Sequence, residues 1–395
     1  MKLRTFSESD VRGKNVLVRV DFNVPLKNGK VTDSTRILAH RETVSTLLGW
    51  GAQVALSSHL GRPKGKRVPE MSLECVLSEA EKAFRVPTRF CNDCIGPSVQ
   101  SAVDGMKAGE LLLLENLRFY AEEQENDTAF AGKLAAPFDV FVMDAFSASH
   151  RADASTNAIM GILPSFSGAL LRREVEMLSA VSEKPESPFV LILGGAKVSD
   201  KIGVVEHLMD KTSTILIGGG MAFTFLKAAG KPIGRSLFEA EKKDFALEMM
   251  EKAQRSGVEI LLPTDVVVGT SLEMTSGEKI VSADALPDDA MGLDIGPKTV
   301  SLFAERIAGA RTVLWNGPMG VFENPLFASG TKGVAEGVAA CTSKGGITVV
   351  GGGDTAAAAK MLGFDQNVSH VSTGGGASLE FCEGKDLPGI KPLEE

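Results

Sequence analysis

The segment 189-FVLILGGAKVSDKIGVVEHLM-209 decides the fold class. Its first five residues are apolar without interruption, which is typical of a strand buried on both faces. The pair Gly194-Gly195 then predicts a turn, and residues 199–209 have the period of an amphipathic helix. A buried strand that leads through a tight turn into a helix predicts a βα unit of a parallel sheet.

The same alternation extends from this segment in both directions. Stretches of helical period cover residues 34–50, 72–84 and 239–255. Further apolar runs, each predicted to be a strand, cover residues 15–20, 53–57, 111–114, 139–143, 213–217, 259–262, 311–315 and 346–350. The sequence therefore predicts an α/β protein whose parallel sheets are covered by helices on both faces.

A polar stretch with two prolines, 182–188 (SEKPESP), divides the chain. It follows an amphipathic run at 168–181, which we interpret as a helix that joins two α/β halves. Because 395 residues exceed what one core usually supports, two domains are favoured over one large sheet with a surface loop. We place the first domain at 1–170, the connecting helix and hinge at 171–185, and the second domain at 186–377.

The overall composition is that of a globular protein, with 44% hydrophobic and 23% charged residues. A net charge of −8 argues against nucleic acid and anionic membranes as partners, since both bind basic surfaces. No apolar run approaches the roughly 20 residues of a membrane span. Five scattered cysteines form no disulfide framework and the first ten residues lack an apolar signal core, so we expect a cytoplasmic protein. For the lone CxxC motif at 91–94, ordinary thiols are favoured over a zinc or redox site.

Basic side chains follow the predicted strands of the first half. They are His59, Arg62, Arg118 and Arg151, joined by Arg36 near the start of the predicted helix 34–50, and by the polar Asp21 and Asn23 after the first strand. Because ligands bind at the carboxyl ends of parallel strands, we expect these side chains to converge. Converging guanidinium groups suit a small molecule with several negative charges. The alternative is a set of surface salt bridges.

Glycine takes the place of arginine at the strand ends of the second half. Glycine-rich turns follow the predicted strands at 189–193, 213–217, 311–315 and 346–350, and another lies at 374–376. Such turns lead into helix N-termini, whose free N–H groups bind phosphate. Lys197 and Lys201 are four residues apart and are expected to share one helix face, and Asp354 is expected to hold a phosphate-bound Mg²⁺. No Walker A or strand-following GxGxxG sequence is present, so the predicted nucleotide site is of another type; tight turns without a ligand are the alternative.

Seven ordered motifs closely resemble those of the phosphoglycerate kinase family. They are DFNVP (21–25), SHLGRPKG (58–65), ENLRFY (115–120), GGAKVSDKIGV (194–204), WNGPMGVFE (315–323), GGGDTAAA (351–358) and STGGGASLE (372–380). The resemblance runs from end to end and implies two Rossmann-like lobes with a cleft between them, with residues 378–395 returning to the first lobe. It implies a monomeric glycolytic enzyme that transfers a phosphoryl group reversibly from 1,3-bisphosphoglycerate to ADP, giving 3-phosphoglycerate and ATP, with Mg²⁺.

The resemblance also implies roles for individual residues. The phosphoglycerate site would consist of Asp21, Asn23, Arg36, His59, Leu60, Gly61, Arg62, Arg118 and Arg151. The nucleotide site would consist of Lys197, Lys201, Gly218, Gly219, Gly292, Leu293, Asn316, Glu323, Gly351, Gly352, Gly353, Asp354 and Thr355, with Asp354 as the metal ligand and Glu323 at the ribose. The transferring phosphoryl group would be stabilised by Arg36, Lys197, Lys201, Gly374 and Gly375.

Three positions depart from the family pattern. Met143 stands where asparagine is usual, and Ser147 and Ser149 stand where glycine and alanine are expected. We expect these neighbours of Arg151 to alter loop packing without removing a charged group from the site.

The implied reaction needs no general base. Its acceptor is a carboxylate with a pKa near 4, which is already ionised at neutral pH. The protein must therefore align the reacting oxygens and neutralise charge. Two other functions remain open at this point. One is a dinucleotide-dependent oxidoreductase, disfavoured by the missing GxGxxG motif, and the other is a nucleotide sensor without activity, disfavoured by the full set of arginines and lysines.

Overall fold

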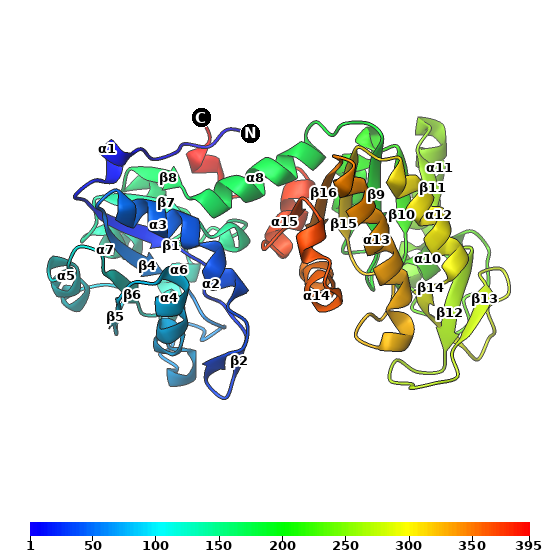
Figure 1. Cartoon of the computed structure of the whole chain (residues 1–395), viewed down its shortest axis with the longest axis horizontal. Helices are drawn as coiled ribbons and strands as arrows, with labels where there is room; N and C mark the ends of the chain where they lie inside the picture. The colour runs from blue at the N-terminus through cyan, green and yellow to red at the C-terminus, as the bar shows by residue number, and fades with distance from the viewer. The chain divides into compact units, whose positions relative to one another are not determined.

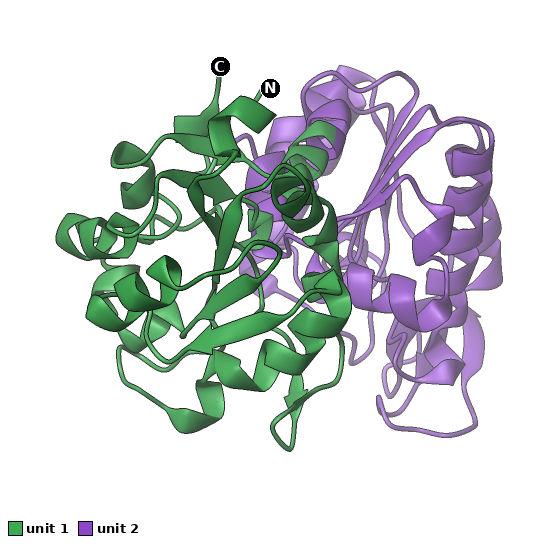
Figure 2. Cartoon of the chain, turned by 60° about the vertical axis from the view of Figure 1, so that its left-hand side comes forward, with its two compact units in different colours: residues 1–176, 386–395 green, residues 177–385 purple.

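The computed structural model describes all 395 residues, and the chain divides into two compact units (Figure 2). Unit 1 consists of residues 1–176 and 386–395, and unit 2 consists of residues 177–385. Each unit is built around its own sheet of six parallel strands. The predicted α/β class is therefore confirmed.

The sheet of unit 1 has the strand order β5-β6-β4-β1-β7-β8, and every neighbouring pair is parallel. Its strands are β1 (Asn15–Arg19), β4 (Gln53–Ser57), β5 (Thr88–Cys91), β6 (Leu111–Leu114), β7 (Val140–Met143) and β8 (Ser165–Ser167). The central strands β6, β4, β1 and β7 are neighbours, so their carboxyl ends lie along one edge of the sheet.

Helices cover both faces of this sheet (Figure 1). They are α1 (Glu8–Val11), α2 (Thr35–Ala39), α3 (Arg41–Gly49), α4 (Leu77–Phe84), α5 (Pro97–Asp104), α6 (Ala121–Gln124) and α7 (Thr128–Ala135), and a small hairpin is formed by β2 (Leu26–Lys27) and β3 (Lys30–Val31). On one face, Val18 packs in a core with Leu47 of α3 and Ala80 of α4. Leu17 and Phe141, which point to the other face, are equally buried.

The helix predicted at 34–50 is interrupted at His40, which ends α2 and precedes α3. The buried His40 ring accepts a hydrogen bond from the Asp21 backbone N–H at Nε2 (2.9 Å) and donates from Nδ1 to Asp144 (2.8 Å). The prediction of one continuous helix is wrong because this ring is held by two loops of the sheet. As a result, α2 is a single short helix that carries Arg36 to the end of β1.

The sheet of unit 2 has the order β11-β10-β9-β15-β16-β17 and is also parallel throughout. Its strands are β9 (Phe189–Leu193), β10 (Thr214–Ile217), β11 (Glu259–Leu261), β15 (Thr312–Asn316), β16 (Ile347–Gly351) and β17 (His370–Val371). The helices of unit 2 are α9 (Ile202–Leu208), α10 (Ala222–Ala228), α11 (Lys243–Ser256), α12 (Pro297–Ala308), α13 (Ser329–Ser343), α14 (Gly353–Leu362) and α15 (Gly376–Cys382). Trp315 packs on one face with Phe303 of α12 and Val338 of α13, while Leu314 is buried on the other face.

An antiparallel sheet that the sequence did not predict extends unit 2. Its central strand β12 (Asp265–Gly269) pairs with β13 (Lys279–Ser282) and with β14 (Met291–Ile295). Phe223 of α10 packs against this sheet in a core that includes Val266 and Val268. The sheet positions Gly292 and Leu293, two residues of the predicted nucleotide site, on β14.

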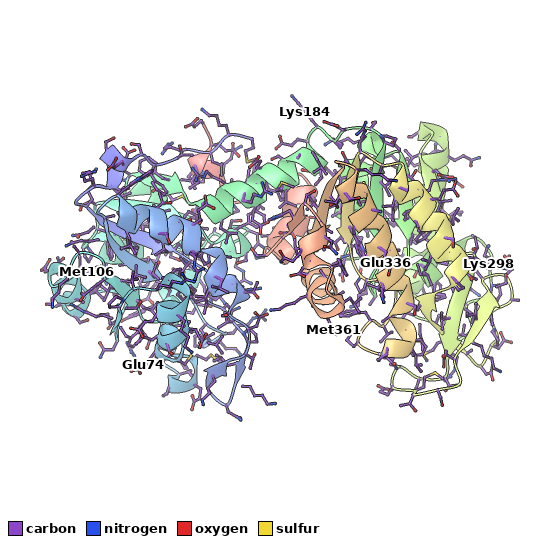
Figure 3. The ribbon with its side chains drawn as sticks, in the orientation of Figure 1. Glu74, Met106, Lys184, Lys298, Glu336 and Met361 are labelled. Atoms are coloured by element: carbon purple, nitrogen blue, oxygen red, sulfur yellow. The ribbon has the colours of Figure 1, made fainter.

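The division between the units falls within α8 (Ala169–Ser182), a helix where the connector was predicted. The segment after it, with Lys184 (Figure 3), leads into β9. Residues 386–395 return to unit 1, where Arg4 N–H donates to the Leu393 carbonyl and Gly389 N–H to the Ser149 carbonyl, both at 2.8 Å. No helix combines the length and the apolar character needed to cross a bilayer.

Candidate active site

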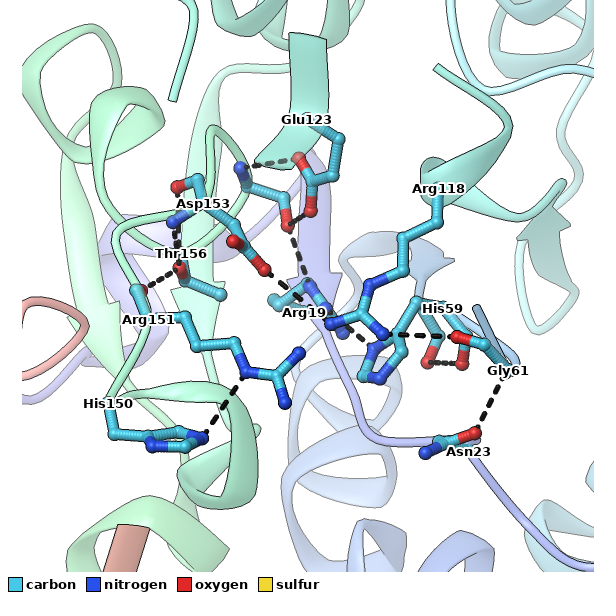
Figure 4. Close-up of polar contacts among 12 residues, drawn as sticks. Arg19, Asn23, His59, Gly61, Arg118, Glu123, His150, Arg151, Asp153 and Thr156 are labelled. Carbon is cyan, nitrogen blue, oxygen red and sulfur yellow. Dashed lines mark hydrogen bonds and ion pairs between the residues drawn. The ribbon is translucent and has the colours of Figure 1, made fainter. Parts of the chain in front are cut away.

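Four adjacent strands of unit 1 end beside one another and carry the predicted anion site. Beyond these ends lie Arg118 after β6, His59 after β4, Asp21 after β1 and Arg151 after β7. Figure 4 shows how the side chains of His59, Arg118 and Arg151 gather in one place. The expected convergence at the carboxyl edge of the sheet is therefore present in the geometry.

Asp21 is the centre of a hydrogen-bonded cluster. Its Oδ2 accepts from Arg36 Nη1 at 2.9 Å and from the Ser147 hydroxyl. Although burial opposes ionisation of Asp21, the Arg36 charge and the hydrogen bonds hold the pKa of its carboxyl below the ordinary value. Ser147, one of the positions that depart from the family pattern, removes no charged group, and its hydroxyl reaches the same oxygen as Arg36.

The backbone around this cluster is fixed by the same residues. Arg36 Nη1 also donates to the Asn23 carbonyl at 3.1 Å, and the Asn23 side-chain oxygen accepts from Gly61 N–H at 2.9 Å. The side chain of Arg36 keeps 38% of its surface exposed. One guanidinium nitrogen of Arg36 is therefore held in place, while more than a third of the side-chain surface stays exposed.

His59 is present as the neutral imidazole. Burial, and next the charge of Arg19, lower its pKa well below the ordinary value. Arg19 Nη2 lies 3.1 Å from His59 Nδ1. Because a guanidinium group can only donate, Nδ1 is the acceptor and the proton resides on Nε2. His59 can thus donate a hydrogen bond to an anion.

Arg118 has the clearest unsatisfied binding capacity in unit 1. It is 3% exposed, and its Nη1 donates to the Gly61 carbonyl at 3.0 Å. Its Nε and Nη2 have no hydrogen-bond partner, and Asp153 Oδ2 lies 3.9 Å from Nη2, beyond hydrogen-bonding distance. Burial lowers the pKa of Arg118 to about 10, so the group stays charged at neutral pH. Buried unpaired N–H groups on a cation indicate a missing anionic ligand.

The other predicted residues of unit 1 differ in their surroundings. Leu60 is buried and forms part of the core, whereas Arg151 is half-buried and its Nε donates to His150 Nε2 at 3.3 Å. Arg62 is exposed and makes no hydrogen bond or ion pair. Arg62 therefore stays a prediction that rests on the motif.

Unit 2 contains a mainly apolar cavity of about 560 Å³. Its walls include the predicted residues Gly219, Gly292, Leu293 and Glu323, with Asp354 at one end. At Gly292 a side chain has no room, because a Cβ atom there would overlap the ring of Phe223. At Gly219, φ is +64° and a Cβ atom would lie 2.6 Å from the Gly195 nitrogen. At both positions protein atoms fill the space that a side chain would need, so glycine is required for the packing of this cavity wall.

A second, more polar cavity of about 640 Å³ lies next to it in unit 2. The two share Gly195, Ala196 and Asp354. The predicted residues that line the second cavity are Lys197, Lys201, Asn316, Gly352, Gly353, Asp354, Thr355 and Gly375. It is bordered by the N-terminus of α14, so backbone N–H groups and lysines face one space.

The expected arrangement of the two lysines is wrong. Helix α9 starts only at Ile202, and Lys201 is the residue that precedes it. Lys197 lies in the loop after the Gly194-Gly195 turn, so the two residues do not share a helix face. Lys201 instead donates from Nζ to Asn316 Oδ1, and burial lowers its pKa. Both lysines nevertheless line the second cavity.

Three glycines of the predicted site, Gly218, Gly351 and Gly374, line neither cavity. Gly218 packs beneath Met319, since a Cβ atom would lie 2.5 Å from its sulfur. These three stay predictions as ligand-contacting residues.

The residues of the second cavity fit a magnesium ion that arrives with a nucleotide. Asp354 is exposed at the first turn of α14, and Asp200 is the other aspartate in the lining. No group of three or more metal-ligating side chains exists in the chain. Magnesium in nucleotide sites takes one or two carboxylates and completes its shell with phosphates and water, which matches this arrangement.

Four polar residues behind the anion site were not predicted from the sequence. Arg19, Glu123, Asp153 and Ser155 are all buried. Arg19 had a signal, because it is a lone charge within the apolar run 15–20. The other three had none, since their contacts depend on loops that only the fold brings together.

Comparisons with known proteins give one consistent family. The family model described as phosphoglycerate kinase matches residues 6–385. The phosphoglycerate kinase of Moorella thermoacetica is 51% identical over 391 residues, which are 99% of each chain. A relative from Arabidopsis thaliana called phosphoglycerate kinase 3, cytosolic, is 49% identical over 393 residues, 99% of this chain and 98% of the relative.

Solved structures of the same family are also similar. The phosphoglycerate kinase structure from Coxiella burnetii has a TM-score of 0.89 at 40% identity, with 99% of each chain covered. The structure from Pyrococcus horikoshii has a TM-score of 0.83 at 29% identity, with 99% of this chain and 98% of that chain covered.

Proposed function

Because the chain belongs to the phosphoglycerate kinase family, we propose that unit 1 binds the phosphoglycerate and unit 2 binds the nucleotide. The reaction is the glycolytic phosphotransfer. A phosphoryl group moves reversibly from 1,3-bisphosphoglycerate to ADP, which gives 3-phosphoglycerate and ATP. Our proposal concerns which residues bind each substrate and stabilise the transferring group.

The observation that carries the assignment of unit 1 is the unpaired guanidinium edge of Arg118. Its free Nε and Nη2 suit two oxygens of a phosphate or carboxylate. Arg151 and the Nε2–H of His59 add donors around the same space. Asp21 and Asn23 supply the acceptors that a substrate hydroxyl needs.

The two cavities of unit 2 fit the two ends of a nucleotide. We assign the base to the apolar cavity, whose lining includes Gly219, Gly292 and Leu293. Glu323, in the same lining, is assigned to the ribose hydroxyls. The phosphates belong to the polar cavity with Lys197, Lys201 and the N-terminus of α14.

In the direction that consumes ATP, a carboxylate oxygen of 3-phosphoglycerate attacks the γ-phosphorus. The bond from phosphorus to the bridging oxygen of ADP breaks, and no proton has to be removed from the nucleophile. Arg36, with its partly exposed side chain, and Lys201 are proposed to neutralise charge on the transferring group. A bound Mg²⁺ at Asp354 would supply further charge neutralisation on the phosphates.

We further propose that the protein is a cytoplasmic monomer and that its two units move towards each other for phosphoryl transfer. All five cysteines are free thiols, which suits a reducing compartment, and the Arabidopsis relative is called cytosolic. Reactants held on different units must come to about 3–3.5 Å of one another for transfer, and the segment 171–185 is the proposed hinge.

The test is a coupled assay of ADP formation from ATP and 3-phosphoglycerate with increasing Mg²⁺. We expect turnover by the wild type. Asp354→Ala should reduce it by at least about 10–100-fold, with partial recovery in excess Mg²⁺. Asp210→Ala, an exposed aspartate that lines neither cavity, is the matched control. Nucleotide binding without any turnover would instead identify a sensor.

A further inference from the structure

A chain of hydrogen bonds connects a buried carboxylate in α6 with His59 of the anion site (Figure 4). Glu123 Oε1 accepts from the Ser155 hydroxyl at 2.5 Å, and Oε2 accepts from Ser155 N–H at 3.0 Å. Ser155 Oγ in turn accepts from Arg19 Nε at 2.8 Å. Arg19 Nη2 then lies 3.1 Å from His59 Nδ1. Arg19 is therefore the donor to both Ser155 and His59, and Ser155 is the donor to Glu123.

This chain lies inside the protein, where the charge of Arg19 needs compensation. Arg19 and Glu123 are both 0% exposed. The charged groups around Arg19 are Glu123, Asp153, Asp21 and Arg151, and those around His59 are Arg19, Asp21, Arg118 and Arg151. A buried guanidinium group without a hydrogen-bonded counter-charge is strongly unfavourable.

Glu123 is the carboxylate best placed to compensate Arg19. Asp21 already accepts from Arg36 and Ser147 through one oxygen, and Asp153 Oδ2 has no hydrogen-bond partner at all. The other bonds of Arg19 go to the Val20 carbonyl and to His59. Only Glu123 is connected to Arg19 through an unbroken path of hydrogen bonds, by way of Ser155.

We propose that Glu123 is a positioning residue for the phosphoglycerate site: through Ser155 it holds Arg19 against His59 Nδ1, which keeps the His59 proton on Nε2, facing the substrate anion. This inference rests on the proposed substrate site of unit 1. Without the carboxylate, Arg19 is no longer oriented and His59 can present a lone pair to the anion. Glu123 does not touch the substrate.

The variant Glu123→Gln separates this role from a simple charge effect. Its amide can accept at one oxygen only, so one of the two Ser155 donors loses its acceptor. Removing a negative charge near arginines should by itself tighten the binding of an anion. The proposal predicts the opposite: KM for 3-phosphoglycerate rises about tenfold, the effect of losing one hydrogen bond to a charged group. The value of kcat and the KM for ATP should stay within about threefold of wild type.

Glu122→Gln is the matched control, since it makes the same change at the exposed neighbouring position of α6. We expect it to leave KM unchanged. A lowered or unchanged KM for 3-phosphoglycerate in Glu123→Gln would overturn the proposal. A loss of thermal stability with unchanged KM would show a structural role only.

A second measurement does not depend on turnover. Nitrogen NMR of the ligand-free protein, with the His59 signals assigned by their loss in His59→Gln, should show the Nε2–H tautomer in the wild type and in Glu122→Gln. In Glu123→Gln, or in Ser155→Ala if the first variant fails to fold, the spectrum should shift towards a mixture of tautomers. A wild-type His59 that is charged or protonated at Nδ1 would overturn the proposal. Absence of turnover with 3-phosphoglycerate would overturn the proposed function. The NMR measurement would then still test whether Glu123 controls the tautomer of His59.

Discussion

At the scale of single residues, the anion site depends on protonation states that burial determines. Desolvation and the neighbouring Arg19 disfavour a charge on His59, whereas Arg36 and two hydrogen bonds favour the charge on Asp21. The two residues therefore play different parts. Asp21 is a fixed acceptor, and His59 is a neutral donor.

The variant His59→Gln should retain most of its activity. Glutamine keeps an N–H donor but cannot transfer a proton near neutral pH, and no proton transfer is required. We expect kcat within about threefold of wild type, with the same flat pH profile between about pH 6.5 and 8.5, since the folded His59 has already lost its charge in this range. Steady-state kinetics over this range are the measurement. A loss of several hundredfold in kcat at unchanged KM would show that His59 is a general acid or base.

The sign of the His59 contribution to stability follows from its lowered pKa. The unfolded chain binds the proton more tightly than the folded protein. The neutral buried ring therefore contributes no penalty above the unfolded pKa of about 6.5, and stability falls as the pH drops below it.

At the scale of helices and strands, a glycine on β14 allows close packing beside the base cavity. Gly292 N–H donates to the Ser236 hydroxyl at 2.9 Å, and the ring of Phe223 fills the space where a side chain would be. The backbone of β14 at Gly292 and the Phe223 ring of α10 are thus packed directly against each other.

Gly292→Ala should damage nucleotide binding selectively. The added methyl group has to displace the Phe223 ring, which costs about 1–3 kcal/mol of overpacking. We expect KM for ATP to rise about tenfold, while KM for 3-phosphoglycerate stays as in wild type. Gly309→Ala is the control, because the nearest atom to its Cβ would lie at 3.8 Å. Equal effects on both substrates would contradict the assignment of the base to this cavity.

Most elements with a continuous apolar run were predictable from the sequence, although the buried strand β12, with valine at 266–268, was missed. The strands at 53–57, 111–114 and 189–193 have the predicted bounds, because a buried strand leaves an uninterrupted apolar signal. Strand β13 is mostly exposed and leaves no such signal. The break at His40 was missed because its causes, Asp21 and Asp144, are remote in sequence.

The site was predictable to the extent that motifs specify it. The motif residues at the carboxyl ends of β1, β4, β6 and β7 gather as expected. The start of α9 was placed too early, so Lys201 was assigned to a helix that begins after it. Ser155 bonds to Arg19 across 136 positions of sequence, and no local pattern reports such a contact.

At the scale of the whole molecule, the two proposed substrate sites belong to different units. The phosphoglycerate residues belong to unit 1 and both cavities belong to unit 2. Neither unit alone holds both reactants in this assignment. In this proposal, phosphoryl transfer requires both substrates to be bound and the two units to approach each other.

Small-angle X-ray scattering tests this coupling. With 3-phosphoglycerate and a non-hydrolysable ATP analogue plus Mg²⁺ both present, we expect a smaller radius of gyration than with either ligand alone. The physical reason is that both reactants contribute to contacts that only the approached units can make. Asp354→Ala should show a reduced change at the same nucleotide concentration. Identical curves for ligand-free and doubly bound wild type would contradict the proposed motion.

The return of residues 386–395 to unit 1 has a consequence for the order of synthesis. Leu3 forms a bridge with Glu394, and the Asn157 side chain donates to the Pro388 carbonyl at 2.9 Å. The ribosome makes the sheet of unit 1 first, yet these partners emerge only after all of unit 2 has been translated. Because residues 386–395 follow unit 2 in the sequence, unit 1 keeps an unfilled surface until the whole of unit 2 has been synthesised. Unit 1, whose sheet is synthesised first, is therefore the unit whose folding is completed last.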